Sequence, residues 1–144
     1  MLLQMFVALS MVILTLVVHV TGLGGLLALM SRQGRRPPVG KEHLASAVLI
    51  LLIVHALFFL HMFAVFAYAV LYVAVGAMPD FQDAIRFSAG AYATVGSDLL
   101  VTPAWRLVAA IEAANGVFLL GWSTAFFVTI LDRIRLIADA WLRR

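Results

Sequence analysis

The stretch that decides the fold reads FSAGAYATVGSD and runs from Phe87 to Asp98. It is a polar interruption, with two glycines, between two strongly apolar segments. Inside a membrane, irregular backbone is tolerated only where protein buries it or where it borders a water-filled path. The stretch therefore predicts a segment that is buried in protein or lines a water-filled path, and the residues from Thr94 to Asp98 at its end are candidate site residues.

Composition places the chain among integral membrane proteins. Hydrophobic residues make up 65% of its 144 residues and charged residues only 12%, against about a half and about a quarter in soluble domains. The absence of cysteine excludes disulfides and thiolate metal sites. The formal net charge of +3 is small and the basic residues flank apolar segments, so we expect membrane lipid, and no nucleic acid, as a partner.

Three long apolar segments predict three membrane-spanning helices, because each exceeds the roughly 20 residues that cross the hydrocarbon core. The chain divides into an additional N-terminal helix (1–31), a basic loop (32–43), a pore domain (44–132) and a C-terminal extension (133–144). Within the pore domain we expect an outer helix over 44–77, a pore helix and filter over 80–98, and an inner helix over 103–132. The first segment lacks a positive start and exceeds the roughly 7–15 apolar residues of a signal peptide, so we expect a retained helix.

Basic residues predict the orientation in the cell membrane. The loop over 32–43 carries four basic residues and one acid, and the residues after 131 carry four arginines and two aspartates. Loops rich in Lys and Arg stay in the cytoplasm. The C-terminus is therefore predicted to be cytoplasmic, and the N-terminus and residues 78–106 are predicted to face outward.

A short helix is predicted between the second and third spans. Asp80 has the character of an N-cap, with Asp83 three residues later, and a helix from Phe81 to about Ala93 would be about 20 Å long. That length is too short to cross the membrane, which makes the helix a re-entrant candidate. Its C-terminal end carries partial negative charge and favours a cation, and an extended segment over 94–98 would return outward.

This order of elements resembles the pore domain of the potassium channel superfamily over roughly residues 44–132. The family's pore stretch typically reads F-S-x-x-T-x-T-T-V-G-Y-G-D, and the chain matches it at Phe87, Ser88, Thr94, Val95, Gly96 and Asp98. Alanines stand at 91 and 93, where the family usually carries threonine. Downstream, WRLVA at 105–109 and NG at 115–116 resemble the start of the family's inner helix. GWSTAF from Gly121 is similar to inner helices of small bacterial ion-channel proteins.

The resemblance implies a homotetramer whose subunits surround an axial pore. The backbone carbonyls of residues 94–96, with the Thr94 hydroxyl, would replace the water shell of a monovalent cation, K⁺ or Na⁺. Phe87, Ser88 and Tyr92 would belong to the pore helix behind them. The resemblance implies passive transport, with no catalysis, no organic substrate and no cofactor besides the permeant ion.

The chain departs from the family pattern directly after Gly96. Ser97 and Asp98 replace the family's Tyr-Gly-Asp, and either alignment of these two residues loses the aromatic residue and the second glycine. The outer one or two of the family's four ion sites would be missing or widened, as in a related non-selective bacterial type that reads T-V-G-D-G. We therefore predict K⁺ conduction with weakened selectivity over Na⁺, and the alternative within this class is a fully K⁺-selective channel. Rings of Ser97 hydroxyls and Asp98 carboxylates would also suit a divalent ion at the outer mouth.

Three residues of the third span are candidates for gating or for lining the cavity: Glu112, Gly116 and Gly121. Glu112 is an acid within an apolar span, and such groups are usually functional or paired. It would either line the cavity or brace the filter from behind, or else be satisfied by Arg106 or by pore-helix backbone. Gly116 lies where many members of the family carry a gating-hinge glycine, and this role is implied by the resemblance alone.

Three histidines in the spans leave a function of another class open. His55 and His61 are six residues apart and do not share a helix face, so a haem would need His19 and one of the other two as ligands. Polar lining, hydrogen bonding between helices and pH sensing are other possible roles. A non-conducting haem-binding or accessory helical membrane protein is therefore the alternative outside the channel class.

Overall fold

The computed structural model describes residues 1–32 and 42–142, and every regular element in these residues is helical. In chain order the elements are α1 (Leu2–Arg32), α2 (Glu42–Ala74), α3 (Phe81–Tyr92), a 3₁₀ turn η1 (Pro103–Trp105) and α4 (Arg106–Leu142). Three stretches are long and apolar enough to cross a membrane: Leu2–Ser31, Leu44–Ala74 and Pro103–Ile134. The predictions of an all-α fold and of three candidate membrane spans are confirmed. Most of the basic loop predicted over 32–43 lies outside the described residues.

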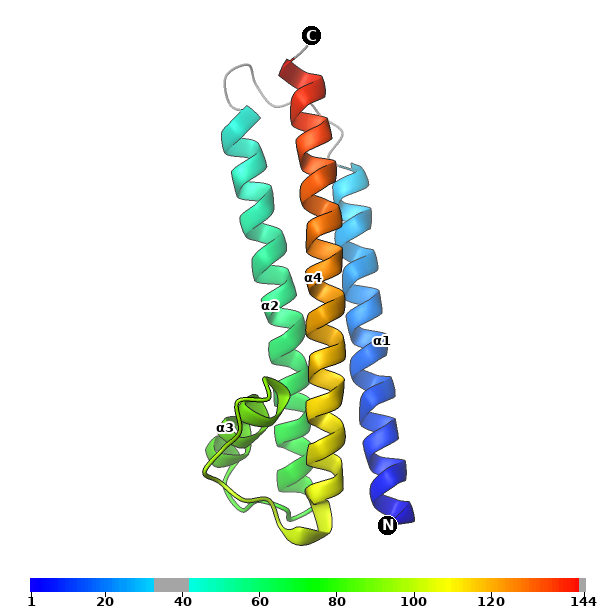
Figure 1. The fold of residues 1–144 in the computed structure, drawn as a ribbon, viewed down its shortest axis with the longest axis vertical. Helices are drawn as coiled ribbons and strands as arrows, with labels where there is room; N and C mark the ends of the chain where they lie inside the picture. Colours follow the sequence, from blue (N-terminus) through cyan, green and yellow to red (C-terminus); the bar gives the residue numbers. More distant parts are fainter. Residues whose placement is uncertain (33–41, 143–144) are drawn as a thin grey trace.

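The three long helices lie side by side along the long axis of the molecule (Figure 1). α1 and α4 run in the same direction, and α2 runs in the opposite one. The N-terminus therefore lies at the end of the bundle that carries α3, and the C-terminal end of α4 lies at the other end (Figure 1). Each helix satisfies its own backbone hydrogen bonds, as a segment that crosses lipid must.

The second helix ends three residues before the predicted boundary at residue 77, because Gly76 turns the chain. Gly76 has a φ of +66°, a left-handed conformation that glycine adopts without steric cost. Its N–H donates to the Val73 carbonyl, and the N–H of Ala77 donates to the Tyr72 carbonyl, which closes the helix end in a Schellman arrangement. At the other boundary, α4 continues past residue 132 to its end at 142, so the C-terminal extension prolongs the third long helix.

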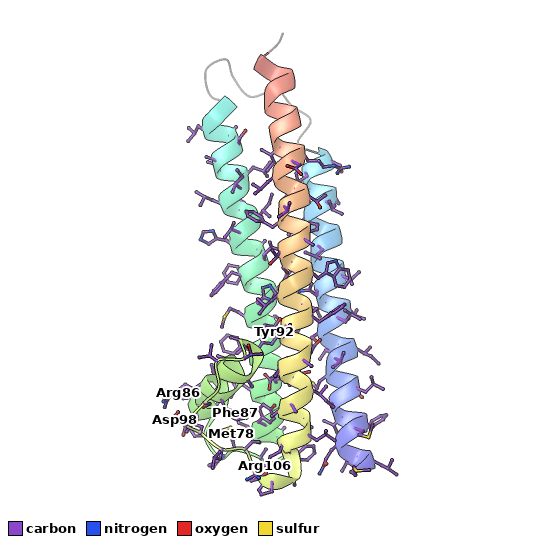
Figure 2. All side chains as sticks on the ribbon, in the orientation of Figure 1. Met78, Arg86, Phe87, Tyr92, Asp98 and Arg106 are labelled. Carbon is purple, nitrogen blue, oxygen red and sulfur yellow. The ribbon has the colours of Figure 1, made fainter. Side chains whose placement is uncertain are left out.

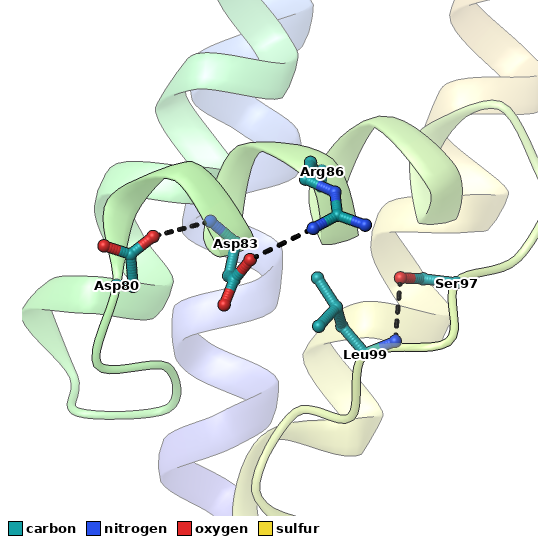
Figure 3. A network of polar contacts seen from close by, with 5 residues as sticks. All are labelled: Asp80, Asp83, Arg86, Ser97 and Leu99. Carbon is teal, nitrogen blue, oxygen red and sulfur yellow. Dashed lines mark hydrogen bonds and ion pairs between the residues drawn. The ribbon is translucent and has the colours of Figure 1, made fainter.

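The short helix α3 begins where the sequence predicts. The Asp80 side chain accepts a hydrogen bond from the Asp83 N–H at 3.0 Å (Figure 3), which satisfies one of the free N–H groups of the first turn. The helix has 12 residues and is therefore about 18 Å long. Figure 1 shows the chain rising along α3 and then returning to the end of the bundle where α4 begins. α3 thus lies along part of the bundle without extending over its length.

The end of the bundle that carries α3 has its own hydrophobic core. Tyr68, Tyr72, Phe87 and Val108 are buried in it and come from α2, α3 and α4. The rings of Tyr72 and Phe87 meet edge to face with their centroids 5.3 Å apart, an arrangement that aromatic pairs favour. A second core around Ile53 joins the long helices without α3. Packing against both α2 and α4 therefore fixes α3 on the bundle.

The outer faces of the long helices are apolar. On α2, Phe58, Phe59 and Phe63 are all exposed, and the same holds for many aliphatic side chains of α1 and α4. Exposed apolar surface of this extent marks contact with a membrane or with another protein. Exposed charged side chains lie instead toward the two ends of the molecule: Arg86 and Asp98 at the end that carries α3 (Figure 2), and Asp132 and Arg133 toward the other end of α4.

Candidate functional site

The predicted ion-binding residues, Thr94 to Asp98, follow directly after the last turn of α3. All five are exposed in the single chain. Val95 is 84% exposed, although its side chain is apolar and gains from being removed from water. The loop is therefore not covered by other parts of its own subunit.

The chain turns tightly as it leaves α3. The N–H groups of Val95 and Gly96 both donate to the Gly90 carbonyl, at 3.0 and 3.1 Å. Thr94 and Gly96 have φ values of +57° and +86°. A positive φ is common for glycine, but for a β-branched residue such as threonine it is a strained conformation. The extended segment predicted over 94–98 therefore begins only after this turn. The Gly90 carbonyl is one of the groups at the helix end without a helical partner, and it accepts both hydrogen bonds.

Gly90 has a structural role that the sequence alone did not reveal. A Cβ atom at this position would overlap the carbonyl oxygen of Gly96, so only glycine allows the loop to lie back on α3. In this arrangement the Gly96 oxygen faces α3. Beyond the turn, the Ser97 hydroxyl accepts a hydrogen bond from the Leu99 N–H at 3.1 Å (Figure 3). In the sequence, only the spacing of Gly90 and Gly96, six residues apart, could have indicated the contact between Gly90 and the Gly96 oxygen.

The three predicted pore-helix residues, Phe87, Ser88 and Tyr92, are all buried on α3. The Ser88 hydroxyl donates to the Val65 carbonyl of α2 at 2.9 Å. The Tyr92 hydroxyl lies 2.8 Å from Nδ1 of His61, which is also on α2. Polar contacts to α2 therefore fix both the middle and the C-terminal end of α3.

Glu112 of α4 lies behind α3 and is fully buried. The Tyr72 hydroxyl donates to its Oε2 at 2.5 Å, and the Ser88 hydroxyl lies 2.5 Å from its Oε1. The carboxyl group thus joins α4 to α2 and α3. Its partners are neither Arg106, which is exposed, nor pore-helix backbone. Among the expected roles, the position fits a brace behind the loop and does not fit a group on the open face of α4.

The two candidate gating glycines differ in their surroundings. A Cβ on Gly116 would overlap the Tyr92 carbonyl oxygen and lie 2.9 Å from the Tyr92 carbonyl carbon. Gly116 therefore allows the end of α3 to approach α4, a role separate from the hinge that the resemblance implies. A Cβ on Gly121 would meet nothing within 4 Å. The helix is continuous through both residues.

The histidines also differ from one another. His19 and His61 face each other across α1 and α2, with ring centroids 5.2 Å apart. His19 Nε2 lies 2.9 Å from the Ser123 hydroxyl of α4, and His61 bonds Tyr92, so each ring already engages a protein hydroxyl. His55 is turned away and bonds the carbonyl of its own helix at Leu51. The pair links all four helices, which the sequence could not show because the contacts depend on how the helices pack.

The site offers backbone oxygens, hydroxyl groups and carboxylates. No group of three or more His, Asp or Glu side chains suited to hold a metal ion occurs among the described residues. Comparison with protein-family models, with curated proteins and with solved structures finds no match for this chain. The function therefore has to be inferred from the geometry of the loop and of the helices that hold it.

Proposed function

We propose that four copies of this chain form a passive cation channel in the cell membrane, with residues 94–98 lining the narrow part of the path. The observation that carries the proposal is the placement of α3 and the loop after it. α3 is shorter than the roughly 30 Å of hydrocarbon, is packed against α2 and α4, and is followed, after Ala93, by the five exposed residues of the loop. The exposed Val95 gives the loop an apolar surface that neighbouring subunits would cover.

Backbone strain at Thr94 supports a functional role for the loop. The φ of +57° at this threonine costs about 1–2 kcal/mol for a residue with a side chain. Strain of this kind collects at sites that hold a ligand in a fixed geometry. A hydroxyl and a carbonyl at a strained position can both be directed at one ion.

In the proposed tetramer, peptide oxygens of residues 94–96 replace part of the water shell of K⁺ or Na⁺. The Gly96 oxygen faces α3 in the single chain, so this peptide has to turn toward the axis when the four loops meet. Glycine allows this rotation because it has no Cβ. The C-terminal ends of four α3 helices add partial negative charge near the axis, which favours a cation over an anion.

The loop sequence supports weak rather than strict K⁺ selectivity. The match to the filter pattern stops after the three residues TVG, and the next position holds Ser97 instead of an aromatic residue that could hold the outer carbonyls in place. Ser97 and Asp98 are exposed next to the turn. In a tetramer they would form a ring of hydroxyls and carboxylates at the outer mouth, a set of hard oxygen ligands that also suits a divalent ion.

The proposal is tested by reconstituting the purified protein in liposomes and measuring reversal potentials with K⁺ on one side and Na⁺ on the other. Weak selectivity predicts a permeability ratio P(Na)/P(K) above about a twentieth, and a lower ratio would support the fully selective alternative. No cation current at all, with the protein inserted, would contradict the channel proposal. Cross-linking in mild detergent provides the second test. Fourfold assembly would be contradicted by a species larger than a tetramer, and equally by a sample that contains only monomer.

A further inference from the structure

Three oxygen-bearing side chains and one carbonyl meet where α2, α3 and α4 pack together. Glu112 is at the centre, with the Tyr72 hydroxyl 2.5 Å from Oε2 and the Ser88 hydroxyl 2.5 Å from Oε1. The Ser88 hydroxyl is also 2.9 Å from the Val65 carbonyl oxygen. Glu112, Ser88 and Tyr72 are all fully buried.

The hydrogen atoms in this cluster can be counted. Three oxygen–oxygen contacts lie at hydrogen-bond distance, and each needs one proton between its atoms. Tyr72 has one hydroxyl proton, which serves Oε2, and Ser88 has one, which serves either Val65 or Oε1. If Glu112 were a carboxylate, one of the two contacts of Ser88 would hold two oxygens together with no proton between them.

A proton on Oε1 of Glu112 supplies the hydrogen that the third contact lacks. The carboxylic acid then donates to Ser88, Ser88 donates to the Val65 carbonyl, and Tyr72 donates to Oε2. Each of the three contacts has one donor and one acceptor. The result is a continuous chain of hydrogen bonds from α2 through α4 and α3 back to α2.

Among the residues that the structure describes, no positive charge lies against Glu112 to keep a carboxylate ionised. Within the described residues, the Glu112 carboxyl bonds the Tyr72 hydroxyl of α2 and the Ser88 hydroxyl of α3, and the charge of its ionised form would also act on Tyr68 of α2 and Tyr92 of α3. No charged group of α1 or α4 acts on it among the described residues. An unpaired charge that is fully removed from water is strongly unfavourable, and such groups are neutralised instead.

We propose that Glu112 is a neutral carboxylic acid at pH 7, and that its hydroxyl donates to Ser88 and thereby positions α3 against α2 and α4. Glu112 is thus a positioning residue and not a cavity charge. Ser88 lies on α3, which ends at Tyr92 just before the loop, so the effect of Glu112 on the loop rests on the proposed channel function. Its protonation does not depend on that function.

Infrared spectroscopy of the full-length protein in liposomes at pH 7 tests the protonation directly. A protonated carboxyl group has a C=O stretch apart from the amide and carboxylate bands, and we expect such a band in the wild type and its loss in Glu112→Gln. In Tyr72→Phe the band should move to higher frequency, because the C=O oxygen loses its hydrogen bond. Identical spectra for wild type and Glu112→Gln in this region would overturn the proposal.

Thermal unfolding of matched variants tests the positioning role. The glutamine amide in Glu112→Gln can donate to Ser88 and accept from Tyr72, as the neutral acid does, so its midpoint should stay close to that of the wild type. Glu112→Ala removes both contacts and leaves a cavity, and its midpoint should fall by about 5 °C or more. Equal losses in the two variants would contradict a neutral donor at this position. A wild-type protein that shows the band but carries no current would refute the channel and leave this inference intact.

Discussion

Gly116→Ala tests the contact between the end of α3 and α4. The new Cβ would overlap the Tyr92 carbonyl oxygen and lie 2.9 Å from its carbon and 3.1 Å from its Cα. The oxygen is the nearest obstacle. Nonbonded carbon and oxygen atoms stay about 3.3 Å or more apart, so the last turn of α3 has to retreat by roughly 1 Å or more. Because the obstacle is backbone and cannot rotate away, we expect a loss of about 1–3 kcal/mol in the free energy of unfolding.

Gly121→Ala is the matched control for this variant. It lies on the same helix, and its Cβ would meet nothing within 4 Å. Replacing glycine by alanine in an open helical position stabilises by about 0.4–1 kcal/mol, mainly through the unfolded chain. Thermal unfolding in detergent, followed by tryptophan fluorescence, should therefore separate the two variants by about 5–10 °C. Midpoints that agree within error would refute the close approach of α3 to α4.

Three further predictions concern other parts of the molecule. Gly96→Ala strains a residue whose φ is +86°. We expect cation flux into liposomes to be lost while cross-linking still captures the same oligomer, and full flux would argue against residues 94–98 as the path. Asp80→Ala removes the N-cap of α3 and should lower the free energy of unfolding by about 0.5–2 kcal/mol, whereas Asp83→Ala, which leaves the cap in place, should cost less. A double-mutant cycle of Thr15→Val and Asn115→Leu should give a coupling of about 0.6 kcal/mol for the hydrogen bond between α1 and α4; a coupling of zero would show that this bond contributes nothing.

Much of the fold could be predicted because it depends on local sequence. Apolar length alone located the three long helices, and Asp80 with Asp83 located the start of α3. The end of α2 was misplaced because the left-handed turn at Gly76 was not recognised as a helix stop. The helical continuation of α4 beyond residue 132 could not be distinguished from a separate extension, since its amphipathic pattern permits both.

The candidate site could be predicted only in part. Thr94 to Asp98 were located by their polarity between apolar segments, and the structure places them after α3 as a turned and exposed loop. The contact of Gly90 with the Gly96 oxygen and the partners of Glu112 depend on how closely separate helices approach. Spacing along the chain contains no such information, so Arg106 was as reasonable a partner for Glu112 as Tyr72.

The hydrogen bonds between α1 and α4 have a mechanical consequence. The Asn115 amide donates to the Thr15 hydroxyl at 2.8 Å, and His19 Nε2 lies 2.9 Å from the Ser123 hydroxyl. The two helices are thus joined at two heights by buried polar contacts, and sliding one along the other would break both. Any tilt or rotation of α4 should therefore carry α1 with it as a single rigid body, so that a force applied to the N-terminal helix from the lipid side is transmitted to the third span.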